Sequence, residues 1–181
     1  MRIDVKIPYD PDEKLAEAYN NALMESVTPW VLFLDQDVFL CNPHWYDMCL
    51  YVIDTLDVDP LAACIGCVCG GERHKRSMAK GVIPSSDIEF HIKRSRQHYR
   101  EFGNLVQREK QHIPGYFMLL DREIALKIGF RQVKKRVNNI DQDFGTRLME
   151  AGYHNYIMRG LYIYHRRGMR HLKKDFVIGN G

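Results

Sequence analysis

The residues best suited to chemistry are two aspartates at the end of an apolar run. Asp35 and Asp37 follow residues 30–34 and precede the apolar residues 38–40, so two carboxylates interrupt a stretch that otherwise predicts a buried strand. Residues at i and i+2 of an extended segment point the same way, and ionised carboxylates in apolar surroundings need a compensating partner. Oxygen ligands suit Mg²⁺ or Mn²⁺, which also bind substrate phosphates. The spacing predicts a metal-bridged diphosphate site, and its alternative is a strand that ends at a polar turn.

Alternating strands and helices are predicted to position these carboxylates. Apolar runs predict strands at 3–7, 30–34, 62–69 and 116–120, and two short strands at 153–158 and 161–165. Helical spacing and end signals predict helices at 10–23, 42–56, 87–102, 121–129 and 141–151. This alternation predicts one α/β domain over residues 1–181, with a mostly parallel central sheet flanked by helices. In such folds ligands bind at the carboxyl ends of strands, where Asp35 and Asp37 fall.

Composition and charge limit the classes of partner. With 181 residues, 45% of them hydrophobic, the chain has the size of one domain with a substantial core, and a net charge of +3 does not indicate a nucleic-acid partner. No apolar run approaches the length of a membrane span, and residues 1–7 alternate unlike a secretory signal, so we expect a cytoplasmic protein. Residues 70–103 are expected to form a mobile basic insertion and residues 166–181 a flexible basic tail, both suited to clamping an anionic diphosphate. The sequence leaves open whether the chain forms a homo-oligomer.

The five cysteines predict buried, reduced thiols rather than a disulfide framework. Cys64, Cys67 and Cys69 lie within an apolar run. With His74 they could in principle hold zinc, but the chain has no second Cys-x-x-Cys pair. Thiols in a core strand explain the same residues.

The order of several motifs resembles a family 2 glycosyltransferase of the GT-A fold, over nearly the whole chain. The matching segments are Ala18–Asn20 with Trp30–Asp37 and Asn42–Tyr46, Gly115–Glu123 with Ile128–Phe130, Asp141–Phe144 with Arg147 and Ala151–Tyr153, and Tyr162–His165. The resemblance implies a Rossmann-like GT-A domain that transfers a sugar from a nucleotide donor.

The resemblance also implies a metal centre at the end of the second strand. Asp37 would bind Mn²⁺ or Mg²⁺ directly, Asp35 would contact the donor ribose or reach the metal through water, and His165 would complete the coordination shell. A metal there would neutralise charge on the departing nucleoside diphosphate. The alternative for His165 is a strand-end histidine with a structural hydrogen bond.

Two further parts of the match imply the catalytic base and the sugar subsite. Asp141 matches the aspartate that deprotonates the acceptor in inverting members, and Asp143 is the nearby alternative. Amides at a helix N-terminus favour a charged carboxylate, although acids there are also ordinary helix design. Gly115 and Tyr116 would lie under a sugar, with a core-strand role for Tyr116 as the alternative.

The remaining donor contacts are expected near the ends of the first and last strands. Pro8, Tyr9 and Asp10 follow the first strand and are candidates for the nucleoside pocket. Asn20, in the matched helix, and Arg166, at the start of the basic tail, are assigned to the same donor.

The sequence therefore predicts an inverting, metal-dependent enzyme that moves one sugar from a nucleotide-sugar to a carbohydrate or other hydroxyl acceptor. The enzymatic alternative is a sugar-phosphate nucleotidyltransferase, which usually has a Gly-rich basic loop where this chain has Ile7–Pro11. A further alternative is a non-catalytic module that binds nucleotide or RNA through the basic loops, with binding that weakens steeply with salt.

Overall fold

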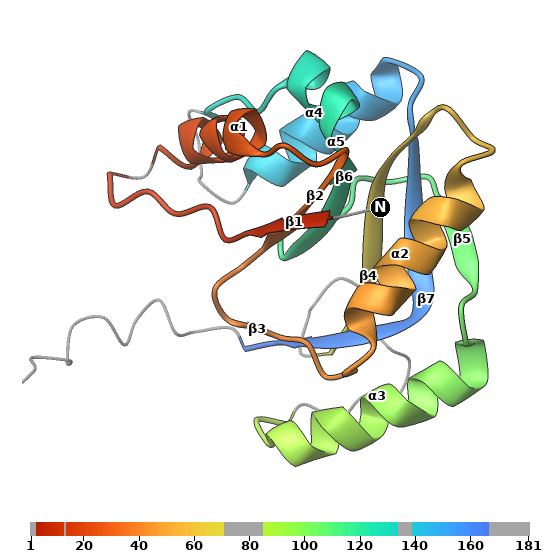
Figure 1. Ribbon diagram of the computed structural model, residues 1–181. Coiled ribbons are helices and arrows are strands. Elements are labelled where there is room, and N and C mark those ends of the chain that lie inside the picture. The colour runs from red at the N-terminus through yellow and green to blue at the C-terminus, as the bar shows by residue number, and fades with distance from the viewer. Residues whose placement is uncertain (1–2, 13, 71–84, 134–138, 167–181) are drawn as a thin grey trace, which may run out of the picture.

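A mixed seven-stranded sheet forms the centre of the molecule (Figure 1). The computed structural model describes residues 3–12, 14–70, 85–133 and 139–166. The strand order is β1-β2-β6-β4-β7-β3, and β5 also pairs with β7. The strands are β1 (Ile3–Lys6), β2 (Trp30–Leu34), β3 (Val38–Phe39), β4 (Ala62–Gly70), β5 (Val106–Glu109), β6 (Phe117–Asp121) and β7 (His154–His165).

The sheet is mixed, so the expectation of a mostly parallel sheet is wrong. β1 pairs with β2 and β4 pairs with β7 in parallel, whereas β6 runs antiparallel to both β2 and β4. β3 and β5 are also antiparallel to β7. Because β6 is reversed, its first residues lie at the same edge of the sheet as the carboxyl ends of β1, β2 and β4.

Helices cover both faces of the sheet. They are α1 (Leu15–Glu25), α2 (Trp45–Leu56), α3 (Ile88–Phe102), α4 (Arg122–Ile128) and α5 (Ile140–Glu150). In Figure 1, α1, α4 and α5 gather over one side, α2 lies across β4 and β7, and α3 lies at the bottom against the end of β7. The expected layered α/β architecture of one small domain is therefore confirmed.

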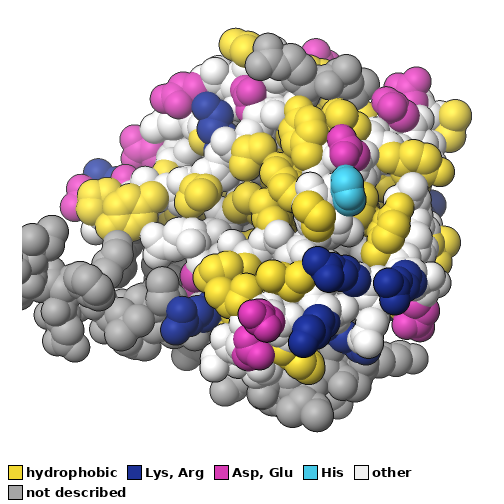
Figure 2. Space-filling model, turned by 60° about the horizontal axis from the view of Figure 1, so that its bottom comes forward, with side chains coloured by type: hydrophobic (Ala, Val, Ile, Leu, Met, Phe, Trp, Pro, Cys, Tyr) yellow, Lys and Arg dark blue, Asp and Glu magenta, His cyan; other side chains and the backbone are white. Residues whose placement is uncertain are grey.

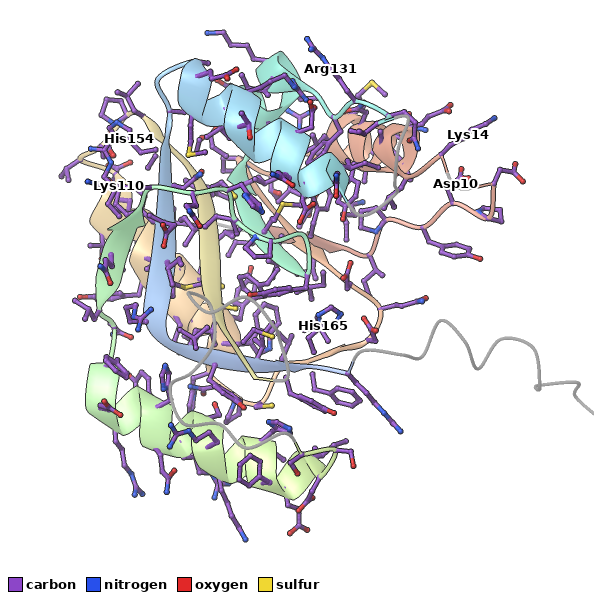
Figure 3. All side chains as sticks on the ribbon, turned by 180° about the vertical axis from the view of Figure 1, so that it is seen from behind. Asp10, Lys14, Lys110, Arg131, His154 and His165 are labelled. Carbon is purple, nitrogen blue, oxygen red and sulfur yellow. The ribbon has the colours of Figure 1, made fainter. Side chains whose placement is uncertain are left out.

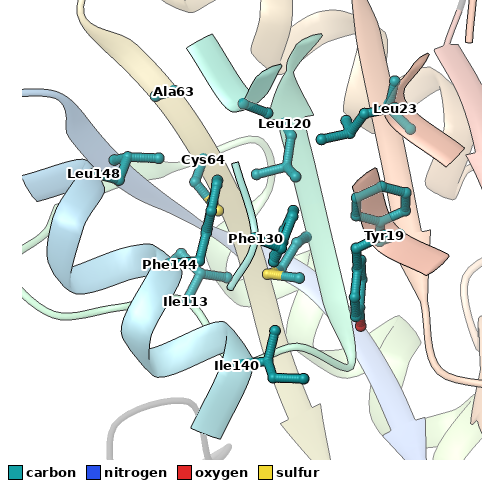
Figure 4. Close-up of a cluster of buried hydrophobic side chains, with 14 of the residues drawn as sticks. Tyr19, Leu23, Ala63, Cys64, Ile113, Leu120, Phe130, Ile140, Phe144 and Leu148 are labelled. Atoms are coloured by element: carbon teal, nitrogen blue, oxygen red, sulfur yellow. The ribbon is translucent and has the colours of Figure 1, made fainter. Parts of the chain in front are cut away.

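Strand β2 shows how period-2 alternation builds the two cores. All five of its residues are buried. Val31 and Phe33 face the α1 and α5 side, whereas Leu32 and Leu34 belong to the cluster that contains α2. On the first side the rings of Tyr19, Phe130 and Phe144 are stacked between helices and sheet (Figure 4).

Local end signals explain several element boundaries. The Asp87 carboxylate accepts from the amide of Glu89 and begins α3, and Asp121 accepts from Ile124 and begins α4. Gly129 ends α4 with φ of 64°, a conformation that glycine adopts without strain. These three boundaries agree with the sequence predictions.

The predicted basic insertion contains a packed helix. α3 presents buried polar side chains, His91, Ser95 and His98, to the sheet, while Lys93, Arg96 and Arg100 are exposed. Figure 2 shows Lys and Arg side chains gathered on the lower half of the face that includes the bottom of Figure 1. The rest of the predicted insertion, 71–84, and the predicted tail beyond Arg166 lie outside the described residues.

One other expectation is wrong. Residues 154–165 form one continuous strand rather than two short ones. This strand pairs with β4 along nearly the whole length of β4, with register shifts between Ala62 and Cys64 and between Cys67 and Val68. Within the described residues, no helix combines the length and apolar character that crossing a membrane requires.

Candidate metal centre and neighbouring carboxylate

The β2–β3 turn brings Asp35 and Asp37 to the end of β7. The amide of Val38 donates to the carbonyl of Asp35 and closes the turn. β3 then pairs antiparallel with β7, so that Val38 lies opposite His165. The amide of Arg166 donates to the carbonyl of Asp37 over 2.9 Å and extends this pairing by one bond. Backbone pairing alone therefore places a histidine beside the two carboxylates.

The three side chains converge. His165 Nε2 lies 3.0 Å from Asp37 Oδ1 and 3.5 Å from Asp35 Oδ2. One ligand atom from each residue lies within 4.8 Å of the others. The Asp37 and His165 side chains are only 10% and 11% exposed, whereas that of Asp35 is 27% exposed. Asp35, Asp37 and His165 therefore lie close together, as the sequence analysis expected. Figure 3 shows His165 at the end of β7.

The chemistry of this donor set fits a divalent cation. The donor atoms are two carboxylate oxygens and one imidazole nitrogen, all within 4.8 Å of one another. Carboxylates are common ligands of Mg²⁺ and Mn²⁺, and imidazole also binds transition metals such as Mn²⁺. Three protein ligands on one side would leave coordination positions for water or for phosphate oxygens. Without a cation, the hydrogen bond from His165 to Asp37 also serves as a structural contact.

Gly115 and Tyr116 precede β6, and Tyr116 contacts the residues that carry these side chains. The amide of Asp35 donates to the carbonyl of Tyr116 over 3.2 Å, and the Tyr116 ring centroid is 5.4 Å from that of His165. Tyr116 is 3% exposed. The expectation that its ring stacks on a sugar is therefore not met, because the ring is enclosed by the core and by His165.

The two aspartates of α5 have different partners. Asp141 Oδ2 accepts from the amide of Gly115 over 2.8 Å, and its Oδ1 accepts from the amide of Gln142. Asp143 instead pairs with Arg147 over 2.9 Å. The same Arg147 guanidinium donates to the carbonyls of residues 128 and 129. Asp143 is thus part of a structural bridge between α5 and α4, whereas the Asp141 carboxylate is held by main-chain amides beside Gly115.

The residues after β1 lie at the same edge of the sheet as Asp35, Asp37 and His165, because β1 is parallel to β2. Tyr9 is more than half exposed. Asp10 Oδ1 accepts from the amides of Asp12 and Lys14, so its carboxylate shapes the loop that precedes α1. Pro8 is half-buried. In Figure 3 the loop with Asp10 lies to one side of His165 rather than over it.

Asn20 and Arg166 have contrasting positions. The Asn20 amide donates to the carbonyl of Phe130 and accepts from its amide, which ties α1 to the segment after α4. This pair of bonds gives Asn20 a structural contact rather than a position at the metal cluster. Arg166 is exposed and follows His165 directly. Its main-chain bond to Asp37 keeps this residue beside the cluster.

The cysteines are free and buried, as the sequence predicted. Burial raises the pKa of Cys41 to about 11 and that of Cys49 to about 12. Burial, with a smaller contribution from the negative charge of Asp141, also raises the pKa of Cys64. Such thiols stay protonated at neutral pH. His74, the fourth member of the zinc alternative, lies outside the described residues.

The sequence did not predict the contact between Gly115 and Asp141. It joins residues 26 positions apart and depends on β6 entering the sheet from the same edge as the metal cluster. The sequence signal was the glycine before an apolar strand, which indicates close approach of another group. The sequence analysis assigned that approach to a sugar, whereas the approaching group in the structure is the Asp141 carboxylate.

No protein-family model matches this chain, and no curated protein matches it in sequence.

Proposed function

We propose that this chain is a metal-dependent glycosyltransferase of the GT-A type, which moves one sugar from a nucleotide-diphosphate sugar to a hydroxyl acceptor. The observation that carries the proposal is the convergence of Asp35, Asp37 and His165 at the carboxyl end of β2. Ligands of α/β sheets bind at this edge. A third carboxylate, Asp141, accepts from the amide of Gly115 before β6.

Asp35, Asp37 and His165 would hold Mn²⁺ or Mg²⁺. When bound there, the cation supplies Lewis-acid assistance, because it offsets the negative charge that develops on the diphosphate. The low exposure of Asp37 and His165 supports this role, since electrostatic effects are larger where water is excluded. Arg166 follows His165 at the surface and adds a positive charge suited to phosphate oxygens.

Asp141 is the proposed general base. Its carboxylate receives the acceptor's proton while the acceptor oxygen forms a bond to the anomeric carbon. The bond from that carbon to the diphosphate oxygen breaks, and its electron pair leaves with the nucleoside diphosphate. Direct displacement of this kind inverts the anomeric centre. Each Asp141 oxygen accepts one main-chain bond and keeps a further lone pair for the proton.

The remaining donor contacts follow from position. Pro8, Tyr9 and Asp10 follow β1, the strand next to β2, and would border the nucleoside, with the exposed Tyr9 ring as the stacking surface. The experiment below identifies the nucleotide base and the sugar of the donor.

The test is release of nucleoside diphosphate from a panel of uridine, guanosine and thymidine diphosphate hexoses, with Mn²⁺, with Mg²⁺ and with chelator. Asp37→Asn removes a charge from the proposed cluster, and Asp47→Asn, whose side chain is 77% exposed on α2, is the matched control. We expect metal-dependent release by the wild type and by Asp47→Asn, and loss in Asp37→Asn. No release from any donor, or equal release by Asp37→Asn, contradicts the proposal.

A further inference from the structure

Two consecutive residues before β6 touch both parts of the proposed site. The amide of Gly115 donates to Asp141 Oδ2 over 2.8 Å. The carbonyl of the next residue, Tyr116, accepts from the amide of Asp35 over 3.2 Å, and its ring lies against His165. This dipeptide therefore links the first turn of α5 to the β2–β3 turn and sets how far the Asp141 carboxylate lies from the metal cluster.

The space beside Gly115 is occupied by the Asp141 side chain. A Cβ atom at position 115 would lie 3.3 Å from Asp141 Cβ and 3.4 Å from Asp141 Oδ2. Contacts this short require the neighbour to shift by a few tenths of an ångström. Position 115 is not among the described glycines with positive φ, which are Gly103, Gly129 and Gly152. The backbone conformation therefore does not require glycine at 115, and a side chain there would crowd the Asp141 side chain.

We infer that Gly115 is a positioning residue for the Asp141 carboxylate, which it holds by its amide and admits by lacking a side chain. The inference rests on the proposed function, because it gives Gly115 a role in the reaction through Asp141. It replaces the expected role of Gly115 as a surface under a sugar. Asp141 touches the acceptor, whereas Gly115 acts only by fixing where Asp141 lies.

The test variant is Gly115→Ala, which keeps the amide donor and adds only the crowding methyl group. Small misplacement of a reacting group costs rate rather than binding, so we expect kcat to fall about tenfold while KM for the donor stays unchanged. Mn²⁺ affinity should also stay unchanged, because the metal ligands lie on other segments. Thr146→Ala, at an exposed position on the same helix, is the matched control and should match the wild type.

A double-mutant cycle separates positioning from general loss of packing. If Gly115 acts through Asp141, Gly115→Ala should have no further effect on kcat in the Asp141→Asn background. A merely structural role predicts the same fractional loss in both backgrounds, and that result overturns the inference. Wild-type kcat in Gly115→Ala overturns it as well.

Asp141→Glu provides a second route that leaves residue 115 intact. The variant keeps a carboxylate, but the side chain is longer by one methylene group, so the carboxylate is displaced from the Gly115 amide. We expect kcat to fall at least about tenfold and Mn²⁺ affinity to stay unchanged. Wild-type kcat in this variant overturns the inference even where Gly115→Ala fails to fold. Failure of the proposed function is distinguishable, because the wild type would then release no nucleoside diphosphate, and the inference would fall with it.

Discussion

At the residue scale, the two acids of α5 differ in what they contact. Asp143 is bound to Arg147, which also holds two carbonyls, and the pair therefore fastens α5 to α4. Asp141 lies two residues earlier in the same helix, and its carboxylate accepts from main-chain amides. Sequence reasoning named both residues as candidate bases, and the pairing of Asp143 is the physical reason to choose Asp141.

Exchanging each carboxylate for an amide should separate these roles. Asp141→Asn should lower sugar transfer by at least about 100-fold, the usual contribution of a general base, while Mn²⁺ affinity is kept. Asp143→Asn should leave transfer near wild type and lower the free energy of unfolding by about 1 kcal/mol, because the pair is partly exposed. Steady-state rates and urea unfolding measure the two effects. Loss of activity in Asp143→Asn with activity kept in Asp141→Asn would reverse the assignment.

The candidate cluster shows what a sequence can predict about a site. Asp35 and Asp37 could be predicted from two charges at the end of a buried strand, because their environment is local. His165 is 128 residues from Asp37, and only the resemblance assigned it to this site. Its place depends on the β3–β7 register, which the sequence did not predict. The sequence left the burial of Tyr116 open between a core-strand role and a sugar contact, because it depends on the long-range contact of its ring with His165.

At the element scale, α3 is held to the sheet by polar groups. His91 is fully buried, and its Nε2 lies 3.0 Å from the carbonyl of Ser85, so this nitrogen must be the donor. Nδ1 is then the acceptor, and the Tyr162 hydroxyl donates to it over 2.7 Å. The His91 ring also stacks on Tyr164, the residue before His165. Helix α3 therefore supports the strand that carries the third proposed ligand.

Removing one hydroxyl tests this attachment. Tyr162→Phe leaves His91 Nδ1 without its donor in a buried position, so we expect the free energy of unfolding to fall by about 1–3 kcal/mol. Tyr99→Phe on the exposed side of α3 is the matched control and should stay within about 0.5 kcal/mol of the wild type. Urea unfolding measures both variants. Equal stability of the two would show that the hydrogen bond contributes nothing.

His98, the second buried histidine of α3, should make the stability of the protein depend on pH. Burial lowers the pKa of His98, and the positive charges of Arg159 on β7 and Arg94 on α3 lower it further, against a smaller opposing effect of Glu101. The folded state therefore prefers neutral His98. This contribution is fully present above the unfolded pKa of 6.5 and is lost as pH falls below it toward the folded pKa.

Comparison of the wild type with His98→Asn isolates that effect. The wild type should lose more stability than the variant as pH falls below 6.5, because the variant has no group to protonate at this position. Denaturant unfolding at a series of pH values gives the difference. A difference between the two proteins that stays constant with pH contradicts the account.

Element type was more predictable than strand direction. The helices α2 to α5 and the strands β2, β4 and β6 follow apolar periodicity and end signals, which are local properties of the chain. β3 and β5 were not predicted, because they are short and only partly buried. The reversal of β6 was missed because alternation of strands and helices does not fix the direction in which the chain re-enters a sheet.

At the scale of the whole molecule, two cores lie on opposite faces of the sheet and fix the helices relative to it. Phe144 is 1% exposed and stacks on Phe130 with a centroid distance of 4.1 Å. It anchors α5, the helix that carries Asp141, to the sheet. The layered architecture was predictable because continuous apolar strands need helices on both sides.

Truncating this anchor should unfold the molecule more readily. Phe144→Ala leaves a cavity between α5 and the sheet, so we expect the free energy of unfolding to fall by about 3–5 kcal/mol. Leu126→Ala on α4, at a position that is 37% exposed, is the control and should cost much less. Urea denaturation compares them, and a loss below about 1 kcal/mol for Phe144→Ala would contradict a rigid core beneath α5.

The most direct test of the central claim is a calorimetric titration of Mn²⁺ into the wild type, Asp37→Asn and the exposed control Asp47→Asn. We predict one site in the wild type and in Asp47→Asn, and affinity weakened at least about 100-fold in Asp37→Asn, because a ligand of the cluster is lost. Equal Mn²⁺ affinity in wild type and Asp37→Asn, or no binding by the wild type, would contradict a metal centre at Asp35, Asp37 and His165.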